Sequence, residues 1–427
     1  MTKTHRCEPD YESSWARFPG TVIVSSRNSQ PRMELGDVPG RAVRKYRQDG
    51  PQELVRAGTD LVIEDVLFYR LVYRRILCNR VDILSREALP SQFDPLVSEP
   101  HDGSMRIKAA AGFRDRQTPA GYDPGDRFVC EIPDTTLLGP AGPGLTAAGT
   151  VVADTVATPP LETRRIGVAL AQSMRANGVR RTLSALSGDA DPDSRLSLAA
   201  LAVPPWTNYY HWTAECLIRI RLLEAYADAK GQYPTLLIPA NPPAWVEESL
   251  SIVDYAGEVQ RWDGSIAAVE TLVVPTFPDP TPTECAWLRN RMRQSVSLTE
   301  RDSERIYVGR GDATVRRVAN RDELQKVLDR YNINTYLLGN LSVREQINLF
   351  SRAELVVGPH GAGLTNILFG DNLTLVELFG DKQIATFDRL AAALDHAYIP
   401  VYGEQTGVDI HVNTDKLDSV IAESLGK

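Results

Sequence analysis

Apolar and polar residues follow two patterns in the second half of the chain, and together these predict strands that alternate with helices. Short strand-type runs lie at 196–203, 235–239, 258–262, 270–275, 305–310, 334–339, 354–358 and 373–378. Stretches with helical spacing of apolar residues lie between them, at 211–230, 243–256, 284–297, 320–331, 342–352 and 364–369. Strands that alternate with helices pair in parallel, with helices on both faces of the sheet. We therefore expect an α/β protein whose ligands bind at the carboxyl ends of the strands.

Helix-start signals support two of these helices. Glu323 follows Asn320 by three residues, and Glu345 follows Ser342 by three. In a capping box the first side chain accepts a hydrogen bond from the backbone at the third helical position, and the side chain at that position bonds back. Helices are therefore expected to begin at both places.

The first half of the chain is less regular. Residues 1–40 are polar and predict a loose tail, and residues 41–88 predict helix. Within that helix, 66–80 carries four arginines and no acidic residue, interleaved with aromatic residues. Such a segment is typical of a helix that lies on an anionic membrane surface. A helix docked on the protein, with its arginines in water or paired with Glu64 and Asp65, is the alternative.

Three further segments break the pattern of alternating strands and helices. The segment 90–126 is rich in Pro, Gly, Asp and Arg and predicts an irregular linker. Turn residues separate short β-type runs in 134–156, as in a hairpin or small sheet. The proline cluster at 275–284 predicts a hinge. The regions we expect are an N-terminal extension at 1–125, α/β units at 126–300 and 301–395, and a C-terminal strand and helix at 396–427 that would return to the first unit.

Composition excludes several classes of protein. Hydrophobic residues make up 43% and charged residues 24% of the 427 positions, as in a soluble globular protein. No run approaches the ~20 apolar residues of a membrane-spanning helix, and the N-terminus has no apolar region of the secretory type. The 5 cysteines form no CxxC pair, which indicates a reducing compartment. A net charge of -8 argues against a nucleic-acid partner. A cytoplasmic protein is therefore expected.

The strongest candidate for chemistry is the glycine-rich turn at 358–366, which follows a buried-type strand and opens a helix. Small residues allow a ligand to approach the backbone, and N–H groups at a helix start attract an anion. Pro359 has no N–H. The expected donors are therefore His360, Gly361, Ala362, Gly363 and Leu364, with the imidazole of His360 in addition. This predicts a diphosphate site; the alternative is a tight connection with a structural histidine. The order of the glycines differs from the dinucleotide fingerprint.

Charged residues at the ends of neighbouring strands could complete this site. Glu377 ends a predicted strand, where a carboxylate can accept hydrogen bonds from two ribose hydroxyls. Arg310, Arg316 and Arg317 lie at or after the end of an earlier strand, and arginine forks bind phosphate. The alternatives are a solvated carboxylate and a basic loop neutralised by Asp312. We expect Arg310 to contact the ligand, with Arg317 as a further candidate.

A second group of polar and aromatic residues surrounds the start of the helix at 211–230. It consists of Trp206, Asn208, Tyr209, Tyr210, His211, Trp212 and Glu215. Asn208 can cap the helix. His211 and Glu215 share a helix face, and an imidazole beside a carboxylate makes a general-base pair. The aromatic residues offer flat surfaces for a sugar ring; the alternative is ordinary packing with a structural pair.

A metal site has little support in the sequence. The 6 histidines form no HxxxH or HExxH pattern. Asp189, Asp191 and Asp193 alternate as in a DxD motif, but they lie in a Ser/Gly-rich loop and favour a turn. The chain also has no Walker A loop and no nucleophile elbow. We therefore expect neither a metal ligand nor a resident cofactor.

Three ordered motifs resemble glycosyltransferase family 61, which includes capsular-polysaccharide biosynthesis proteins and eukaryotic O-linked sugar transferases. They are NYYHWTAECLIRI at 208–220, IYVGRGDATVRRVANRDEL at 306–324 and VVGPHGAGLTNILF at 356–369. The similarity covers about residues 130–400. It implies a GT-B architecture, in which two Rossmann-like lobes face each other across a cleft. It also implies a nucleotide-sugar donor, inversion at the anomeric carbon and no obligatory metal.

The resemblance also implies roles for single residues. On the donor side it places His360, Gly361, Ala362 and Gly363 at the diphosphate, Arg310 near them, and Glu377 on the ribose. On the acceptor side it places His211 and Glu215, one of which is the base, beside Asn208, Tyr209 and Trp212. Many members carry a double arginine directly after the strand; here Arg316 and Arg317 come later, so the arginine that matters stays open.

The resemblance thus implies an inverting, metal-independent hexosyl- or pentosyltransferase. Region 126–300 would hold the acceptor and 301–395 the nucleotide sugar. The acceptor would be a glycan or a lipid-linked glycan, and 66–80 would contact the cytoplasmic face of a membrane. The alternatives are a catalytically silent carbohydrate- or nucleotide-binding protein and a Rossmann-type oxidoreductase, for which the expected G-x-G-x-x-G is missing.

Overall fold

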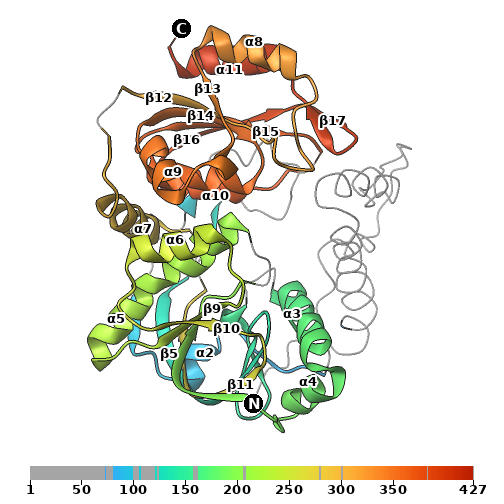
Figure 1. The fold of residues 1–427 in the computed structure, drawn as a ribbon, viewed down its shortest axis with the longest axis vertical. Coiled ribbons are helices and arrows are strands. Elements are labelled where there is room, and N and C mark those ends of the chain that lie inside the picture. Colours follow the sequence, from blue (N-terminus) through green and yellow to red (C-terminus); the bar gives the residue numbers. More distant parts are fainter. Residues whose placement is uncertain are drawn as a thin grey trace, which may run out of the picture.

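The computed structural model describes most of the chain from residue 80 onward. The described residues are 73, 80–99, 105–106, 121–122, 125–156, 162–204, 208–277, 280–299, 302–381 and 383–426. The expected N-terminal tail and nearly all of the basic aromatic segment 66–80 lie outside them. Two large β-sheets organise the described part, with helices between and around them (Figure 1).

The first sheet mixes parallel and antiparallel pairing. Its strands are β1 (Ile83–Leu84), β2 (Val97–Glu99), β5 (Arg127–Leu138), β6 (Gly144–Leu145), β7 (Val151–Val152), β8 (Ser194–Leu201), β9 (Thr235–Pro239), β10 (Val259–Trp262) and β11 (Ile266–Pro275). Along the order β11-β8-β9-β10 neighbours pair in parallel, as predicted. β5 pairs antiparallel with β11, β2 and β6. The turn-rich segment 134–156 therefore forms the predicted small antiparallel region, which extends the parallel strands.

The second sheet is parallel throughout. Its order is β13-β12-β14-β15-β16, with every neighbouring pair parallel. The strands are β12 (Glu304–Val308), β13 (Asn334–Tyr336), β14 (Ala353–Pro359), β15 (Thr374–Phe379) and β16 (Ala397–Tyr402). The strand runs predicted from 305 onward are therefore confirmed, and the carboxyl ends of these strands share one edge.

The C-terminal segment stays with the second sheet. β16 pairs with β15, and α11 (Thr414–Ser424) packs beside α8 (Arg321–Arg330). The prediction that 396–427 returns to the first unit is wrong. The apolar residues Val401 and Ile421 join a buried cluster of the second sheet instead, and β16 covers the edge of β15 that would otherwise expose unpaired backbone groups.

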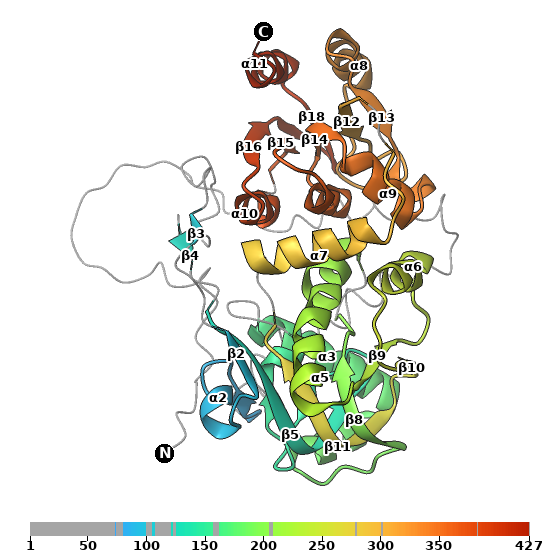
Figure 2. The same ribbon diagram turned by 90° about the vertical axis from the view of Figure 1, so that its left-hand side faces the viewer.

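Helices connect the two sheets into one packed body. They are α5 (Ile220–Lys230), α6 (Ala244–Val253), α7 (Pro282–Gln294), α9 (Val343–Phe350) and α10 (Thr386–Ala393). Figures 1 and 2 both show α6 and α7 against the second sheet's helices. One buried hydrophobic cluster reaches from Ala200 on β8 to Val356 on β14. Glu248 on α6 accepts hydrogen bonds from the backbone N–H groups of Val343 (2.9 Å) and Arg344 (3.1 Å), so α6 caps the start of α9.

One of the two predicted capping boxes is present. Ser342 and Glu345 make both reciprocal bonds at the start of α9. Asn320 precedes α8, but its side chain makes no cap bond to the helix. Its amide instead accepts from the backbone N–H of Val412 and donates to the carbonyl of Val412, both at 2.9 Å. The Asn320 amide also donates to Glu323 Oε2 at 2.8 Å. The chain that follows β18 (Asp409–His411) thus bonds to the side chain that was expected to cap the helix backbone.

The helix predicted at 211–230 is continuous but irregular. It begins as a π-helix, η4 (His211–Cys216), passes through a 3₁₀ segment, η5 (Leu217–Arg219), and continues as α5. Short π segments occur often at functional sites. The predicted apolar stripe is buried, with exposed fractions of 5% or less at Trp212, Cys216, Ile220, Leu223 and Ala227.

The other described elements complete the fold. They are α2 (Leu89–Gln92), β3 (Met105–Arg106), β4 (Gly121–Tyr122), η3 (Ala153–Thr155), α3 (Glu162–Asn177), α4 (Val179–Leu186), η6 (Leu338–Asn340), η7 (Ala362–Phe369), β17 (Glu404–Thr406) and β18 (Asp409–His411). Across the described ranges, every helix is too short or too polar to cross a membrane.

Candidate active site

The glycine-rich turn lies where β14 ends and η7 begins. A Cβ on Gly358 or on Gly363 would come within 3.1 Å of the Val308 side chain on β12, so glycine allows the turn to pack on that strand. Two of the expected backbone donors are engaged: His360 N–H donates to Leu378 O (3.1 Å) and Leu364 N–H to Gly361 O (3.0 Å). The backbone donors that we still expect for an anion are those of Gly361, Ala362 and Gly363.

The His360 side chain is held by two neighbouring strands. Its Nδ1 lies 2.6 Å from Glu377 Oε1, and the Tyr398 hydroxyl donates to Glu377 Oε2 at 2.6 Å. The ring stacks on Phe379 with centroids 5.7 Å apart. Because the carboxylate can only accept, His360 carries its proton on Nδ1 and keeps Nε2 for other partners. Burial and the adjacent carboxylate raise the pKa of Tyr398 far above its usual range, so the phenol remains a donor.

Glu377 is placed differently from the sequence expectation. It is 0% exposed, and both its oxygens are hydrogen-bonded to protein side chains. A ribose could bind to this carboxylate only if His360 or Tyr398 broke its hydrogen bond to Glu377. The geometry favours a positioning role for Glu377, which fixes the orientation and tautomer of His360 as the carboxylate partners of functional histidines commonly do.

Tyr398 provides a stability test of this network. Tyr398→Phe should lower the free energy of unfolding by about 1 to 3 kcal/mol, because it leaves a buried carboxylate oxygen without its donor. Urea unfolding monitored by circular dichroism measures this change. Tyr402→Phe is the matched control: the Tyr402 hydroxyl is buried without a hydrogen-bond partner, so its removal should leave stability nearly unchanged. Equal effects of the two substitutions would contradict the network.

Arg310 brings a positive charge to the turn. It follows β12, and its Nε donates to Val315 O at 3.2 Å. A Cβ on Gly361 would lie 1.8 Å from Arg310 Nη1, so the guanidinium rests on the Gly361 backbone. Burial lowers the pKa of Arg310, partly offset by Asp312. The guanidinium therefore lies at the residue next to His360, within the turn where an anion site is predicted.

Gly361→Ala should displace this guanidinium and weaken the binding of nucleoside diphosphates by about 10- to 100-fold, the worth of a charge-assisted hydrogen bond. Gly361 has an extended backbone (φ -179) that any residue adopts, so the fold should be unaffected. Isothermal titration calorimetry measures the affinity. Gly311→Ala is the control, since a Cβ there would meet only ordinary contacts with Leu337. An unchanged affinity for Gly361→Ala would count against Arg310 as a ligand contact.

Arg317, the other expected donor-side arginine, lies in an ion pair. Its Nη2 is 2.9 Å from Asp409 Oδ2 on β18, and its backbone N–H donates to Asp409 Oδ1 at 3.1 Å. These contacts tie the loop after β12 to β18. They give Arg317 a structural role and leave Arg310 as the arginine at the turn.

The acceptor-side candidates gather at the π-helix. His211 Nδ1 lies 2.8 Å from Glu215 Oε2, and Asn208 Oδ1 accepts from the backbone N–H of His211 at 2.9 Å, as a capping side chain does. Arg165 on α3 donates to both oxygens of Glu215, each at 2.9 Å. Burial alone would raise the pKa of Glu215, but the charge of Arg165 and the bonds from His211 and Arg165 hold it below its usual value. Glu215 is therefore an ionised carboxylate.

Trp212 is a core residue, which corrects the expectation that it faces an acceptor. It is 1% exposed, and its indole N–H donates to Ser249 Oγ on α6 at 2.7 Å. Helical spacing placed it on the apolar stripe, and that stripe faces the core. Trp206 lies outside the described residues.

The two candidate groups meet where the sheets meet. The Tyr209 hydroxyl donates to Asn366 Oδ1 on η7 at 3.0 Å. The Tyr210 ring contacts the Phe387 ring edge-on at 5.8 Å, and Phe387 lies 5.4 Å from the His360 ring. An aromatic contact therefore separates the two histidine–carboxylate pairs, one attached to each sheet.

Three residues of this arrangement were not predicted from the sequence as site residues. Arg165 and Tyr398 each complete a histidine–carboxylate pair, and Phe387 lies between the pairs. Arg165 stands beside Arg164 in an ordinary amphipathic helix, so nothing in the sequence distinguishes it. Tyr398 could have been considered, because it lies on β16, the strand next to the one that carries Glu377.

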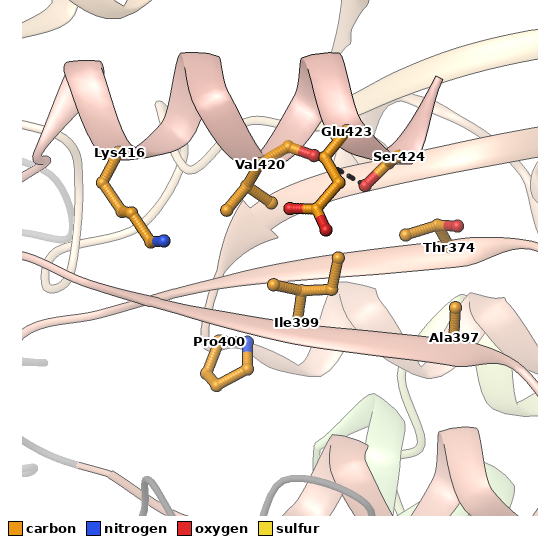
Figure 3. Close-up of a pocket in the computed structure, with 8 residues that line it drawn as sticks. All are labelled: Thr374, Ala397, Ile399, Pro400, Lys416, Val420, Glu423 and Ser424. Carbon is orange, nitrogen blue, oxygen red and sulfur yellow. Dashed lines mark hydrogen bonds between the residues drawn. The ribbon is translucent and has the colours of Figure 1, made fainter. Parts of the chain in front are cut away.

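Two other features of the described residues lie apart from this arrangement. No group of three or more His, Cys, Asp and Glu side chains suited to a metal ion occurs among them. A cavity of about 470 Å³ lies under α11 (Figure 3), lined by Thr374, Ala397, Ile399, Pro400, Lys416, Val420, Glu423 and Ser424. It opens near the starts of β15 and β16, whereas the candidate groups lie at the carboxyl ends.

Two comparisons with known proteins bear on the identity of the chain. No curated protein matches the chain. The family model described as Glycosyltransferase 61 matches residues 209–376, which begin at Tyr209 and end one residue before Glu377. The motifs that carried the sequence resemblance lie almost wholly within this segment. Residues 209–376 are therefore similar to glycosyltransferase family 61, and this match supports a glycosyltransferase activity.

Proposed function

We propose that this protein is an inverting, metal-independent glycosyltransferase that uses a nucleoside-diphosphate sugar. The sugar would pass to a hydroxyl of a glycan or lipid-linked glycan. The observation that carries the proposal is the pairing of Arg310 with His360 at the glycine turn, opposite the His211–Glu215 pair of the other sheet. The two sheets would be the lobes of a GT-B enzyme, with the parallel sheet as the donor lobe.

The donor side must stabilise the charge that develops on the leaving diphosphate. Arg310 supplies a guanidinium and His360 a ring nitrogen, Nε2, at the same turn. Groups fixed before the reaction are effective here because they need no reorganisation as the charge appears. Glu377 and Tyr398 hold the His360 ring in place. These groups would take over the role that a metal ion has in other sugar transferases.

The acceptor side must remove a proton from the attacking hydroxyl. That oxygen forms a bond to the anomeric carbon as the bond from this carbon to the diphosphate oxygen breaks. The electron pair of the broken bond leaves with the diphosphate, and the hydroxyl proton passes to a base on the acceptor side. A single in-line displacement of this kind inverts the anomeric carbon. The His211–Glu215 pair provides the base.

Binding and turnover test the proposal together. Nucleoside diphosphates should stabilise the full chain by about 2 to 3 kcal/mol at a hundredfold excess over Kd, with EDTA present as well as absent. Incubation with a panel of nucleotide sugars and glycan acceptors should then give a product whose anomeric configuration is opposite to that of the donor, as read by NMR. Binding without transfer would support a silent binding protein, and a strict need for a divalent ion would contradict metal independence.

A further inference from the structure

Arg165 completes the acceptor-side pair from outside the family-matched segment. It lies on α3, is 3% exposed, and places its two terminal nitrogens 2.9 Å from the two oxygens of Glu215. This parallel pair of charge-assisted bonds is the most directional contact that a carboxylate makes. The Arg165 guanidinium carbon also lies 5.4 Å from the centre of the Phe277 ring. This cation–π contact helps to hold the guanidinium in place.

The Arg165–Glu215 fork, meaning the two parallel hydrogen bonds from Arg165 to Glu215, fixes the position of the proton on His211. Arg165 Nη2 lies 3.5 Å from His211 Nδ1, at the limit of a hydrogen bond, whereas Glu215 Oε2 lies 2.8 Å from the same nitrogen. The shorter contact dominates. Because the carboxylate can only accept, Nδ1 carries a proton and Nε2 presents a lone pair.

The same two hydrogen bonds make Glu215 less suitable than His211 as the base. Both its oxygens are occupied, and the charge of Arg165 holds the pKa of Glu215 below its usual value despite burial. To take a proton, Glu215 would have to break one bond of the fork. The His211 side chain is also the more accessible of the two, at 21% against 11%.

We propose that Arg165 is the positioning residue that makes His211, and not Glu215, the base of the transfer reaction. This rests on the proposed function and settles which member of the pair takes the proton. Arg165 occupies both oxygens of Glu215 and so leaves Nε2 of His211 as the atom of the pair that takes the acceptor proton. Without Arg165, Glu215 would lose both of these hydrogen bonds and could compete for the proton.

The charged groups around His211 are few among the described residues. Glu215 faces it from the same helix and Arg165 from α3. The Tyr210 ring meets it edge-on at 5.6 Å. Arg219 lies on the same Phe277 ring as Arg165, and it bonds to backbone carbonyls, Leu201 O among them. Arg219 also acts on Glu215 through its charge, whereas Arg165 is the cation that directly contacts both members of the pair.

The first test needs no enzymatic activity. In the full chain labelled with ¹⁵N in its histidine rings, the His211 signals are assigned by their loss in His211→Gln. We expect a neutral ring with Nδ1 protonated and Nε2 bare. The opposite tautomer in the folded protein would overturn the proposal, whatever the donor or acceptor proves to be. Failure to find any sugar transfer would instead overturn the proposed function, so the two failures are distinguishable.

The second test compares three arginine variants. Arg165→Met should move the acid limb of the kcat/KM profile to higher pH by about 1 to 2 units, the usual effect of one neighbouring charge, with activity recovering above the new limb. Arg165→Lys keeps the charge and should shift the limb less. Arg164→Met, at the exposed neighbouring position on α3, should leave the profile in place.

A merely structural role for Arg165 predicts a different result. Activity would then fall by the same factor at every pH, with the limb unmoved, and that outcome would overturn the proposal. If Arg165→Met does not fold, the His211 titration in Arg165→Lys decides the matter. Its midpoint must lie within a few tenths of a pH unit of the wild-type value for the charge argument to hold.

Discussion

His211→Gln should lower kcat for sugar transfer by about 10²- to 10⁴-fold, the usual contribution of a positioned general base. Glutamine keeps a similar size and can still donate to Glu215, so the buried carboxylate retains a partner. It cannot accept a proton at neutral pH, so the acceptor hydroxyl must attack without a base. Steady-state kinetics at saturating donor and acceptor measure this loss.

Donor binding distinguishes a lost base from a damaged fold. The affinity for nucleoside diphosphates should be unchanged in His211→Gln, because the proposed donor contacts, His360 and Arg310, lie with the other sheet. His411→Gln, at an exposed position on β18, is the control and should retain full activity. A normal kcat in a folded His211→Gln protein would remove His211 from the mechanism.

Arg310→Met should lower kcat/KM by about 10²- to 10³-fold, comparable to the loss of one donor from a preorganised anion site. It should also weaken the binding of nucleoside diphosphates, since the guanidinium lies on the Gly361 backbone at the turn. Calorimetry and kinetics on the same preparation separate the ground-state loss from the loss in the transition state.

Arg317→Met tests the choice between the two arginines. Arg317 is engaged with Asp409, so its replacement should affect stability more than donor affinity. If Arg317→Met lost more donor affinity than Arg310→Met, the assignment of the diphosphate to the Arg310 side of the turn would be wrong.

The sequence predicted those features that depend on local pattern. Apolar runs and helical spacing predicted the strands of the second sheet and most of the helices, because burial imposes both periods directly. The parallel pairing then predicted that the ends of two neighbouring strands come together, and His360 indeed meets Glu377 there. Ser342 and Glu345 form the predicted capping box because both partners lie within four residues.

Contacts between distant segments could not be predicted in this way. Arg165 reaches Glu215 across 50 positions, and Arg317 reaches Asp409 across 92. Asn320 bonds to Val412 because the end of β18 happens to lie beside it. Trp212 illustrates a second ambiguity. An aromatic residue beside a candidate base can line a binding site or fill the core, and the sequence does not show which of the two positions the side chain takes.

The position of the diphosphate tests the central claim most directly. A crystal structure of the full chain with a bound nucleoside diphosphate should show the terminal phosphate within hydrogen-bonding distance of Arg310 and of His360 Nε2, at the turn that begins with Gly361. A nucleotide bound elsewhere, for example in the cavity under α11, with the turn empty at saturating ligand, would contradict the account.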